Sequence, residues 1–178
     1  MPGLVQHVIF RLTDSLPGQS YRPSHTEDAR FGVHIDSALD HGHGARTLAI
    51  PEIASLVENA LLRFDGERYV LHAWCIMPNH VHALLKLGAS NSLDQIVHSW
   101  KSYTGTRANR LLRRNGPFWA AEYFDRFMRD EKHLAHTAAY IEANPVKAGL
   151  CESILEWRYS SAWTGWRGQD ACASGSTR

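Results

Sequence analysis

Residues 69–87, YVLHAWCIMPNHVHALLKL, contain two apolar runs of β type separated by the break Met77-Pro78-Asn79. The break is short, which predicts two strands that pair antiparallel. Side chains alternate between the two faces of an extended strand, so His80 and His82 share one face. The apolar residues that alternate with them line the other face: Val81, Ala83, Leu85 and Leu87. The stretch therefore predicts a strand pair that carries two adjacent imidazoles on one side.

The His80 and His82 pair has two interpretations. Two imidazoles side by side on a rigid strand form half of a metal site. The chain has 11 histidines, however, so such a pair also arises by chance and then binds nothing. His41 and His43 have the same spacing, but the glycines around them do not hold a strand, and a loop without a ligand is expected there.

The composition predicts one soluble domain. The chain has 178 residues, of which 44% are hydrophobic and 21% charged, which is enough to bury a core. No stretch reaches the ~20 apolar residues of a membrane span, and the N-terminus does not resemble a secretory signal, so a cytoplasmic location is expected. Cys75, Cys151 and Cys172 are far apart, which disfavours a disulfide framework or a thiolate zinc site. We expect one domain over residues 1–166 and a disordered tail over residues 167–178.

The order of apolar patterns predicts an α+β fold, with one antiparallel sheet and helices packed against it. Strands are expected at residues 5–12, twice within 69–87, and within 117–129. Helices are expected at residues 25–40, 51–64 and 92–114, with Ser92 as an N-cap, and from Asp130 onward. The last helix should end at Asn144, because the residue before a proline disfavours the α conformation.

One face of the predicted helix 92–114 is basic, although the net charge of the whole chain is only +1. Residues 95–116 contain five cations and no acidic residue. A helical spacing places four side chains on one face: Tyr103, Arg107, Arg110 and Arg114. The face is either simply solvated or contacts phosphates, with Tyr103 stacking on a base.

Tyr140 and Asn144 are four residues apart, so they are neighbours on one helical face. A phenol can attack phosphorus, and an amide oxygen can complete a metal site begun by two imidazoles. The alternative is that Tyr140 packs in the core and Asn144 caps the end of the helix.

Two motifs carry a resemblance to a known family. MPNHVHALL, followed about sixty positions later by YIEANPVKAGL, resembles the REP-associated tyrosine transposases, members of the HUH group of single-strand DNA endonucleases. The stretches HVIFRLTDSLP, DGERYVLHAW, SWKSYTG and FWAAEYFDRFMRDE are similar to the same family, so the resemblance covers roughly residues 5–163.

The resemblance implies a fold, a site and an activity. The fold would be a ferredoxin-like, RRM-like α+β sandwich. His80 and His82 match the family's metal ligands, Asn144 matches the residue that completes the site, and Tyr140 matches the nucleophile. The metal would be Mg²⁺ or Mn²⁺. Lys101 and Arg126 lie in family-typical stretches and are expected to contact DNA.

The implied reaction nicks and rejoins single-stranded DNA at hairpin-forming repeats through a 5′-phosphotyrosyl intermediate. One alternative is a catalytically inactive nucleic-acid-binding protein of the same fold, which would not need His80, His82 and Tyr140. Another is a zinc hydrolase that uses water as the nucleophile. A monomer and a homodimer are both compatible with the sequence.

Overall fold

The computed structural model describes residues 4–15, 39 and 44–163. The helix expected at 25–40, apart from Leu39, and the His41 and His43 pair lie outside the described residues, as does the tail 167–178. No helix in the described ranges is long and apolar enough to cross a membrane.

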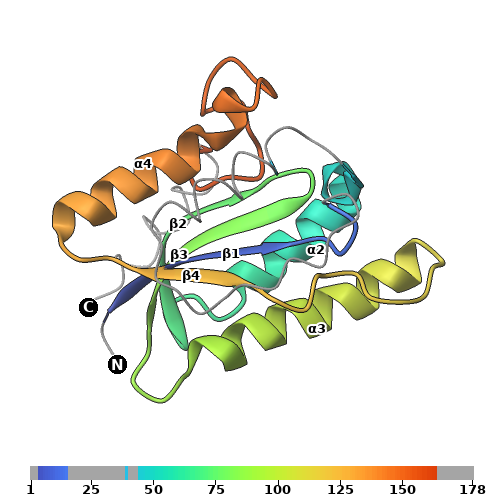
Figure 1. Cartoon of the computed structure of the whole chain (residues 1–178), viewed down its shortest axis with the longest axis horizontal. Coiled ribbons are helices and arrows are strands. Elements are labelled where there is room, and N and C mark those ends of the chain that lie inside the picture. Colours follow the sequence, from blue (N-terminus) through green and yellow to red (C-terminus); the bar gives the residue numbers. More distant parts are fainter. Residues whose placement is uncertain (1–3, 16–38, 40–43, 164–178) are drawn as a thin grey trace, which may run out of the picture.

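The centre of the fold is a four-stranded antiparallel sheet with the strand order β2-β3-β1-β4 (Figure 1). The strands are β1 (Val5–Arg11), β2 (Tyr69–Ile76), β3 (His80–Leu87) and β4 (Phe124–Phe127). The predicted strand pair is thus β2 and β3, joined across residues 77–79. In the β1–β3 register, Ile9 lies opposite His82 and Arg11 lies opposite His80.

Two helices, α2 (Pro51–Leu62) and α3 (Leu93–Leu111), pack on one face of the sheet (Figure 1). The short 3₁₀ turn η1 (Thr47–Ala49) precedes α2 in the chain. Ser92 forms the predicted N-cap, and its hydroxyl accepts a hydrogen bond from the backbone of Gln95. The helix ends earlier than predicted, because Arg113 has a left-handed backbone with φ of 51°.

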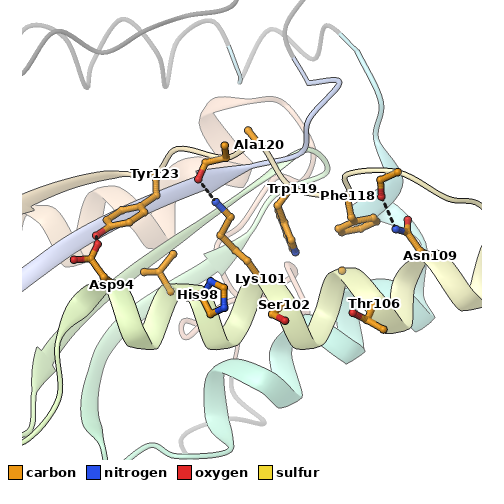
Figure 2. Close-up of a pocket in the computed structure, with 14 residues that line it drawn as sticks. Asp94, His98, Lys101, Ser102, Thr106, Asn109, Phe118, Trp119, Ala120 and Tyr123 are labelled. Carbon is orange, nitrogen blue, oxygen red and sulfur yellow. Dashed lines mark hydrogen bonds between the residues drawn. The ribbon is translucent and has the colours of Figure 1, made fainter.

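The segment predicted as a strand over residues 117–129 is a strand only at its end, in β4. Residues 117–123 instead run alongside α3 (Figure 2). Their aromatic side chains fill space rather than extend the sheet: Trp119 is buried, and its indole N–H donates to the Thr104 hydroxyl at 2.9 Å. Phe118 and Trp119 in this run are buried, but the backbone there does not form the predicted strand.

Helix α4 (Glu131–Lys147) covers β2 and β3 on the opposite face of the sheet from α2 and α3 (Figure 1). Its predicted end at Asn144 is wrong, because the helix continues through Pro145 for three more residues. Pro145 sits in the last turn, so the helix lacks only the backbone bond from this residue. A Schellman motif closes the end: Gly149 has φ of +68°, and the Leu150 N–H donates to the Pro145 carbonyl at 2.9 Å.

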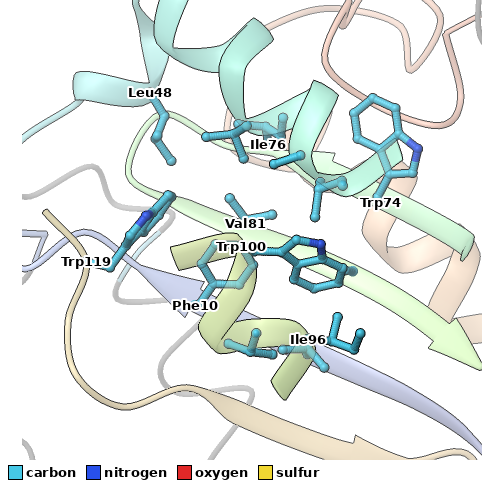
Figure 3. Close-up of a cluster of buried hydrophobic side chains, with 14 of the residues drawn as sticks. Phe10, Leu48, Trp74, Ile76, Val81, Ile96, Trp100 and Trp119 are labelled. Carbon is cyan, nitrogen blue, oxygen red and sulfur yellow. The ribbon is translucent and has the colours of Figure 1, made fainter. Parts of the chain in front are cut away.

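The main core lies between the sheet and the α2–α3 layer (Figure 3). Val81, Ala83 and Leu85 face it, as the alternation in β3 predicts. Aromatic rings fill its centre, where Phe10 packs edge-on against Trp119 at 4.8 Å between ring centroids. A smaller apolar cluster lies under α4 and includes Leu84 and Ile141. The predicted α+β sandwich is confirmed, and its α4 side is where both histidines point.

Candidate metal and nucleophile site

Strand β3 holds His80 and His82 under helix α4. Both side chains are fully buried, with 0% of each residue exposed. Their Nε2 atoms lie 2.9 Å apart, so the two rings converge on one point. Two ring nitrogens at this distance make a good hydrogen bond only if one of them carries a proton.

Asn79 decides which nitrogen of His80 carries its proton. The Asn79 amide nitrogen donates to the Leu39 carbonyl at 3.0 Å, which leaves its Oδ1 as an acceptor. This oxygen lies 2.6 Å from His80 Nδ1, so Nδ1 is the protonated nitrogen. The Nε2 lone pair of His80 is therefore directed at His82.

Asn144 reaches the same point from α4. Its side-chain amide nitrogen lies 2.8 Å from His82 Nε2, although the two residues are 62 positions apart in the chain. Asn144 is 0% exposed, and its Oδ1 has no hydrogen-bond partner among the described residues. A buried amide oxygen without a partner is costly.

These groups fit a divalent ion. Two imidazole nitrogens and an amide oxygen are ligands that such ions accept, and rotating the amide by half a turn exchanges its oxygen and nitrogen. An ion would satisfy both the converging lone pairs and the buried oxygen of Asn144. No cluster of three or more His, Cys, Asp or Glu side chains in the described part of the chain is arranged to hold a metal, and the candidate donor set consists of two imidazoles and one amide.

Tyr140 lies one helical turn before Asn144 and beside His82, with 6.3 Å between the two ring centroids in an edge-on arrangement. The Lys147 ammonium lies 4.0 Å from the centroid of the Tyr140 ring. The structure therefore brings together all four predicted site residues: His80, His82, Tyr140 and Asn144.

Other tyrosines have different surroundings. Tyr69 is buried, donates to the Leu61 carbonyl at 2.6 Å, and has its pKa raised to about 12 by burial. The Tyr123 hydroxyl bonds to Asp94 on α3. Tyr103 stacks with Arg107 on α3, on the far side of the sheet. Tyr21 lies outside the described residues.

Burial also determines the charge of the histidines. It lowers the pKa of His82 to about 3 and holds the pKa of His80 well below its usual value, with nearby histidines adding to the shift at His80. Both imidazoles are thus neutral at pH 7, which is the form that binds a metal.

His7 on β1 is a further member of the site that was not predicted. Its Nε2 lies 3.0 Å from Nδ1 of His82, and the two rings stack with centroids 5.2 Å apart. The sequence contains His7 in an apparent core strand, and only the β1–β3 register reveals its neighbour. A polar residue at an alternating position of an apolar strand was the available signal.

The expected DNA-contact residues are divided between the two faces of the sheet. Tyr103, Arg107 and Arg110 are exposed on α3, away from the histidines. Arg114 does not share their face, because it lies beyond the helix end, where its Nε donates to Asn109 at 3.0 Å. Arg126 lies opposite His7 in the β1–β4 register, near the site.

Lys101 lines a groove of about 590 Å³ between α3 and residues 116–123 (Figure 2). Its ammonium donates to the carbonyls of Ala121 at 2.8 Å and Glu122 at 3.3 Å. The Glu122 carboxylate in turn bonds Arg11 at 2.5 Å. Lys101 therefore fixes the segment that approaches β4, a structural role beside the predicted contact with DNA.

The fold and the site define a class of protein: an α+β sandwich in which a histidine pair on a strand faces a tyrosine and an asparagine on a helix. The sequence profile of the family described as transposase IS200 like matches residues 52–144, which include all four of these side chains. The chain belongs to this IS200-like transposase family.

Two relatives carry related names. A Haemophilus influenzae protein assigned provisionally to the REP-associated tyrosine transposases is 32% identical over 99 residues, which cover 50% of this chain and 56% of that protein. The REP-associated tyrosine transposase of Escherichia coli is 22% identical over 107 residues, covering 60% of this chain and 62% of that protein. The chain thus matches less than two thirds of the length of either relative.

One solved structure has a similar fold. It is a REP-associated tyrosine transposase bound to a REP hairpin, and the similarity covers 97% of this chain and 82% of that one. The TM-score is 0.62 at 15% sequence identity, so the likeness concerns the fold.

Proposed function

We propose that the protein is a metal-dependent tyrosine transposase that nicks and rejoins single-stranded DNA. The observation that carries the proposal is the convergence of His80 Nε2, His82 Nε2 and the Asn144 amide beside Tyr140. A protein that only binds nucleic acid has no need for buried imidazoles next to a tyrosine.

In this proposal His80, His82 and Asn144 hold the ion, which is Mg²⁺ or Mn²⁺. When bound, the ion polarises the scissile phosphate and stabilises the charge that develops on it. The two histidines are neutral and directed by their neighbours, so they serve as ligands and not as proton donors.

Tyr140 is the proposed nucleophile. Its phenolic oxygen loses a proton and attacks phosphorus, the bond from phosphorus to the 3′-oxygen breaks, and that oxygen leaves as a 3′-hydroxyl after taking up a proton. The 5′-phosphate stays on Tyr140. A second 3′-hydroxyl can reverse the step without ATP, because the covalent link conserves the energy of the phosphodiester.

The proposed substrate is a hairpin-forming repeat in single-stranded DNA. Family membership supports it, and so does the fold shared with a transposase whose structure contains a REP hairpin. Arg126 lies nearest to the site among the expected DNA contacts, and Arg107 and Arg110 would bind phosphates farther along the strand.

The test uses labelled single-stranded hairpin DNA, Mn²⁺ and detection of a covalent protein–DNA adduct after denaturation. We expect the wild type to form the adduct on Tyr140, and Tyr140→Phe to form none while its affinity for DNA changes less than about twofold, since only one hydroxyl is lost. Tyr123→Phe is the matched control and should keep the adduct.

The other two functions give different results. DNA binding without any adduct in the wild type would indicate the non-catalytic protein. Cleavage with no adduct would indicate water as the nucleophile and a hydrolase.

A further inference from the structure

His7 is half-buried and packs against His82 on the side away from the converging nitrogens. It comes from β1, the strand next to β3, and its Nε2 meets Nδ1 of His82 at 3.0 Å. The stacked rings, with 19° between their planes, restrict how His82 can turn. His7 thus contacts the nitrogen of His82 that does not face His80 or Asn144.

We propose that His7 is a positioning residue that holds His82 in the tautomer and orientation required of a metal ligand. The inference rests on the proposed function, because it assigns a role toward the same ion. It deepens that function by naming a residue outside the predicted donor set.

The reasoning follows from the chemistry of a neutral imidazole, which has one N–H and one lone pair. His82 can bind an ion through Nε2 only if its proton is on Nδ1. Among the described residues, the acceptor within hydrogen-bond distance of that nitrogen is His7 Nε2. Without His7, the ligand tautomer would leave an N–H buried without a partner, so the population would shift toward the tautomer that cannot bind the ion.

His80 has the same kind of support from a different residue. Asn79 Oδ1 accepts from His80 Nδ1, and the Asn79 amide is itself fixed by the Leu39 carbonyl. Each proposed ligand histidine therefore has a partner on its outer nitrogen. Partners of this type commonly change metal affinity by 10–100-fold when they are removed.

His7 is not itself a ligand in this arrangement. Its Nε2 is directed at the outer nitrogen of His82, whereas Nε2 of His80 and the amide of Asn144 meet the inner nitrogen. A role in orientation and a role in coordination can therefore be separated by the choice of substitution.

Two variants separate the hydrogen bond from the packing. His7→Phe keeps a flat ring against His82 but has no acceptor. His7→Gln loses the ring but offers an amide oxygen to Nδ1. His72→Phe, at an exposed position of the edge strand β2, is the matched control.

The first measurement is Mn²⁺ binding by calorimetry without DNA, on variants shown to be folded by circular dichroism. We expect the Kd for Mn²⁺ to rise roughly 10–100-fold in His7→Phe, to recover to within about threefold of the wild type in His7→Gln, and to stay unchanged in His72→Phe. Equal weakening in both His7 variants, or unchanged affinity in folded His7→Phe, would overturn the proposal.

The second measurement is ¹⁵N NMR of the histidine rings in the metal-free and Mg²⁺-bound protein. His82 should carry its proton on Nδ1 in the Mg²⁺-bound wild type and should populate the Nε2–H form in His7→Phe. An unchanged tautomer in His7→Phe would contradict the inference. These results are independent of Tyr140: normal Mn²⁺ binding with no DNA adduct would reject the proposed reaction and leave the role of His7 intact.

Discussion

At the scale of single residues, the site depends on imidazoles that stay neutral. His80 and His82 are fully buried, and burial penalises a positive charge on either ring. In the form that binds a metal, the Nε2 atoms that face each other both lack a proton. Protonation would add charge to a buried space and place donors against each other. Neutrality is therefore a condition for folding as well as for binding a metal.

This condition predicts that the metal-free protein loses stability in mild acid. Unfolded imidazoles bind protons below a pH of about 6.5, whereas folded His80 and His82 do so only at much lower pH, so the free energy of unfolding falls as the pH drops below 6.5. The loss should be about 1.4 kcal/mol per pH unit for each buried imidazole. Urea unfolding at steps between pH 7.5 and 5 measures it.

Saturating Mn²⁺ provides the control, because a bound ion competes with protons for the same nitrogens. Stability that stays flat between pH 7.5 and 5 without metal would contradict the neutral, buried state of the two histidines.

The residues of the site differ in how far the sequence revealed them. His80 and His82 follow from the alternation of one strand, and Tyr140 and Asn144 from the spacing of one helix, because both patterns are local. That Asn144 touches His82 depends on how α4 packs on the sheet, and the resemblance to a family suggested it. The contact of His7 with His82 could not be predicted, because strand register is set by the whole sheet.

At the scale of elements, the continuation of α4 through Pro145 determines where the Asn144 side chain lies. The turn after Asn144 keeps this residue within a regular helix, so its side chain shares a face with Tyr140. The buried Ile141 and Pro145, together with the Schellman motif, offset the strain of a helical residue before proline. The sequence rule about prolines was correct as a local preference, and tertiary packing outweighed it.

Helix α3 allows a prediction about DNA binding. Arg107 and Arg110 are exposed, and the Arg107 guanidinium stacks on Tyr103 at 4.6 Å, an arrangement suited to phosphates and bases. Replacing both arginines by glutamine should weaken binding of single-stranded DNA. The slope of log K against log salt should become shallower by about 1.4, since each lost phosphate contact contributes about 0.7. Fluorescence anisotropy at several salt concentrations measures both effects.

Arg114→Gln is the matched control, because its guanidinium bonds to Asn109 and to the Pro117 carbonyl at the end of the helix. This variant should lower the melting temperature and leave the salt slope unchanged. If Arg114→Gln changes the slope and the double variant does not, the assignment of the two roles is reversed.

Element boundaries were predictable where local chemistry sets them. Ser92 caps α3 as expected, and Pro51 opens α2 in the first turn. Besides the end of α4, the predictions fail at residues 113 and 117–123, where a left-handed residue and packing against α3 determine the path of the chain. Neither cause has a signature in hydrophobic periodicity.

At the scale of the whole molecule, the sheet separates two surfaces with proposed functions. The histidines and Tyr140 lie under α4, whereas Arg107 and Arg110 lie on the helix that covers the other face. A strand of DNA that touches both surfaces must pass around an edge of the sheet. The β4 edge is suited to this path, because Arg126 lies there and the Lys101–Glu122–Arg11 bonds connect the two sides.

The complete burial of the three proposed metal ligands has a kinetic consequence. His80, His82 and Asn144 are all 0% exposed, so water has no direct route to the point where they meet. We therefore predict that an ion enters during excursions in which α4 separates locally from β3. Loading is then a two-step process in which the protein opens before it binds.

The observed rate of Mn²⁺ loading should therefore rise with ion concentration and then reach a plateau equal to the opening rate of α4. Stopped-flow mixing followed by tryptophan fluorescence can measure this rate, and a rise that stays linear to millimolar Mn²⁺ would show that the ligands are open to solvent. The plateau should have the same value for Mg²⁺, since the opening of the protein limits the rate of loading with either ion.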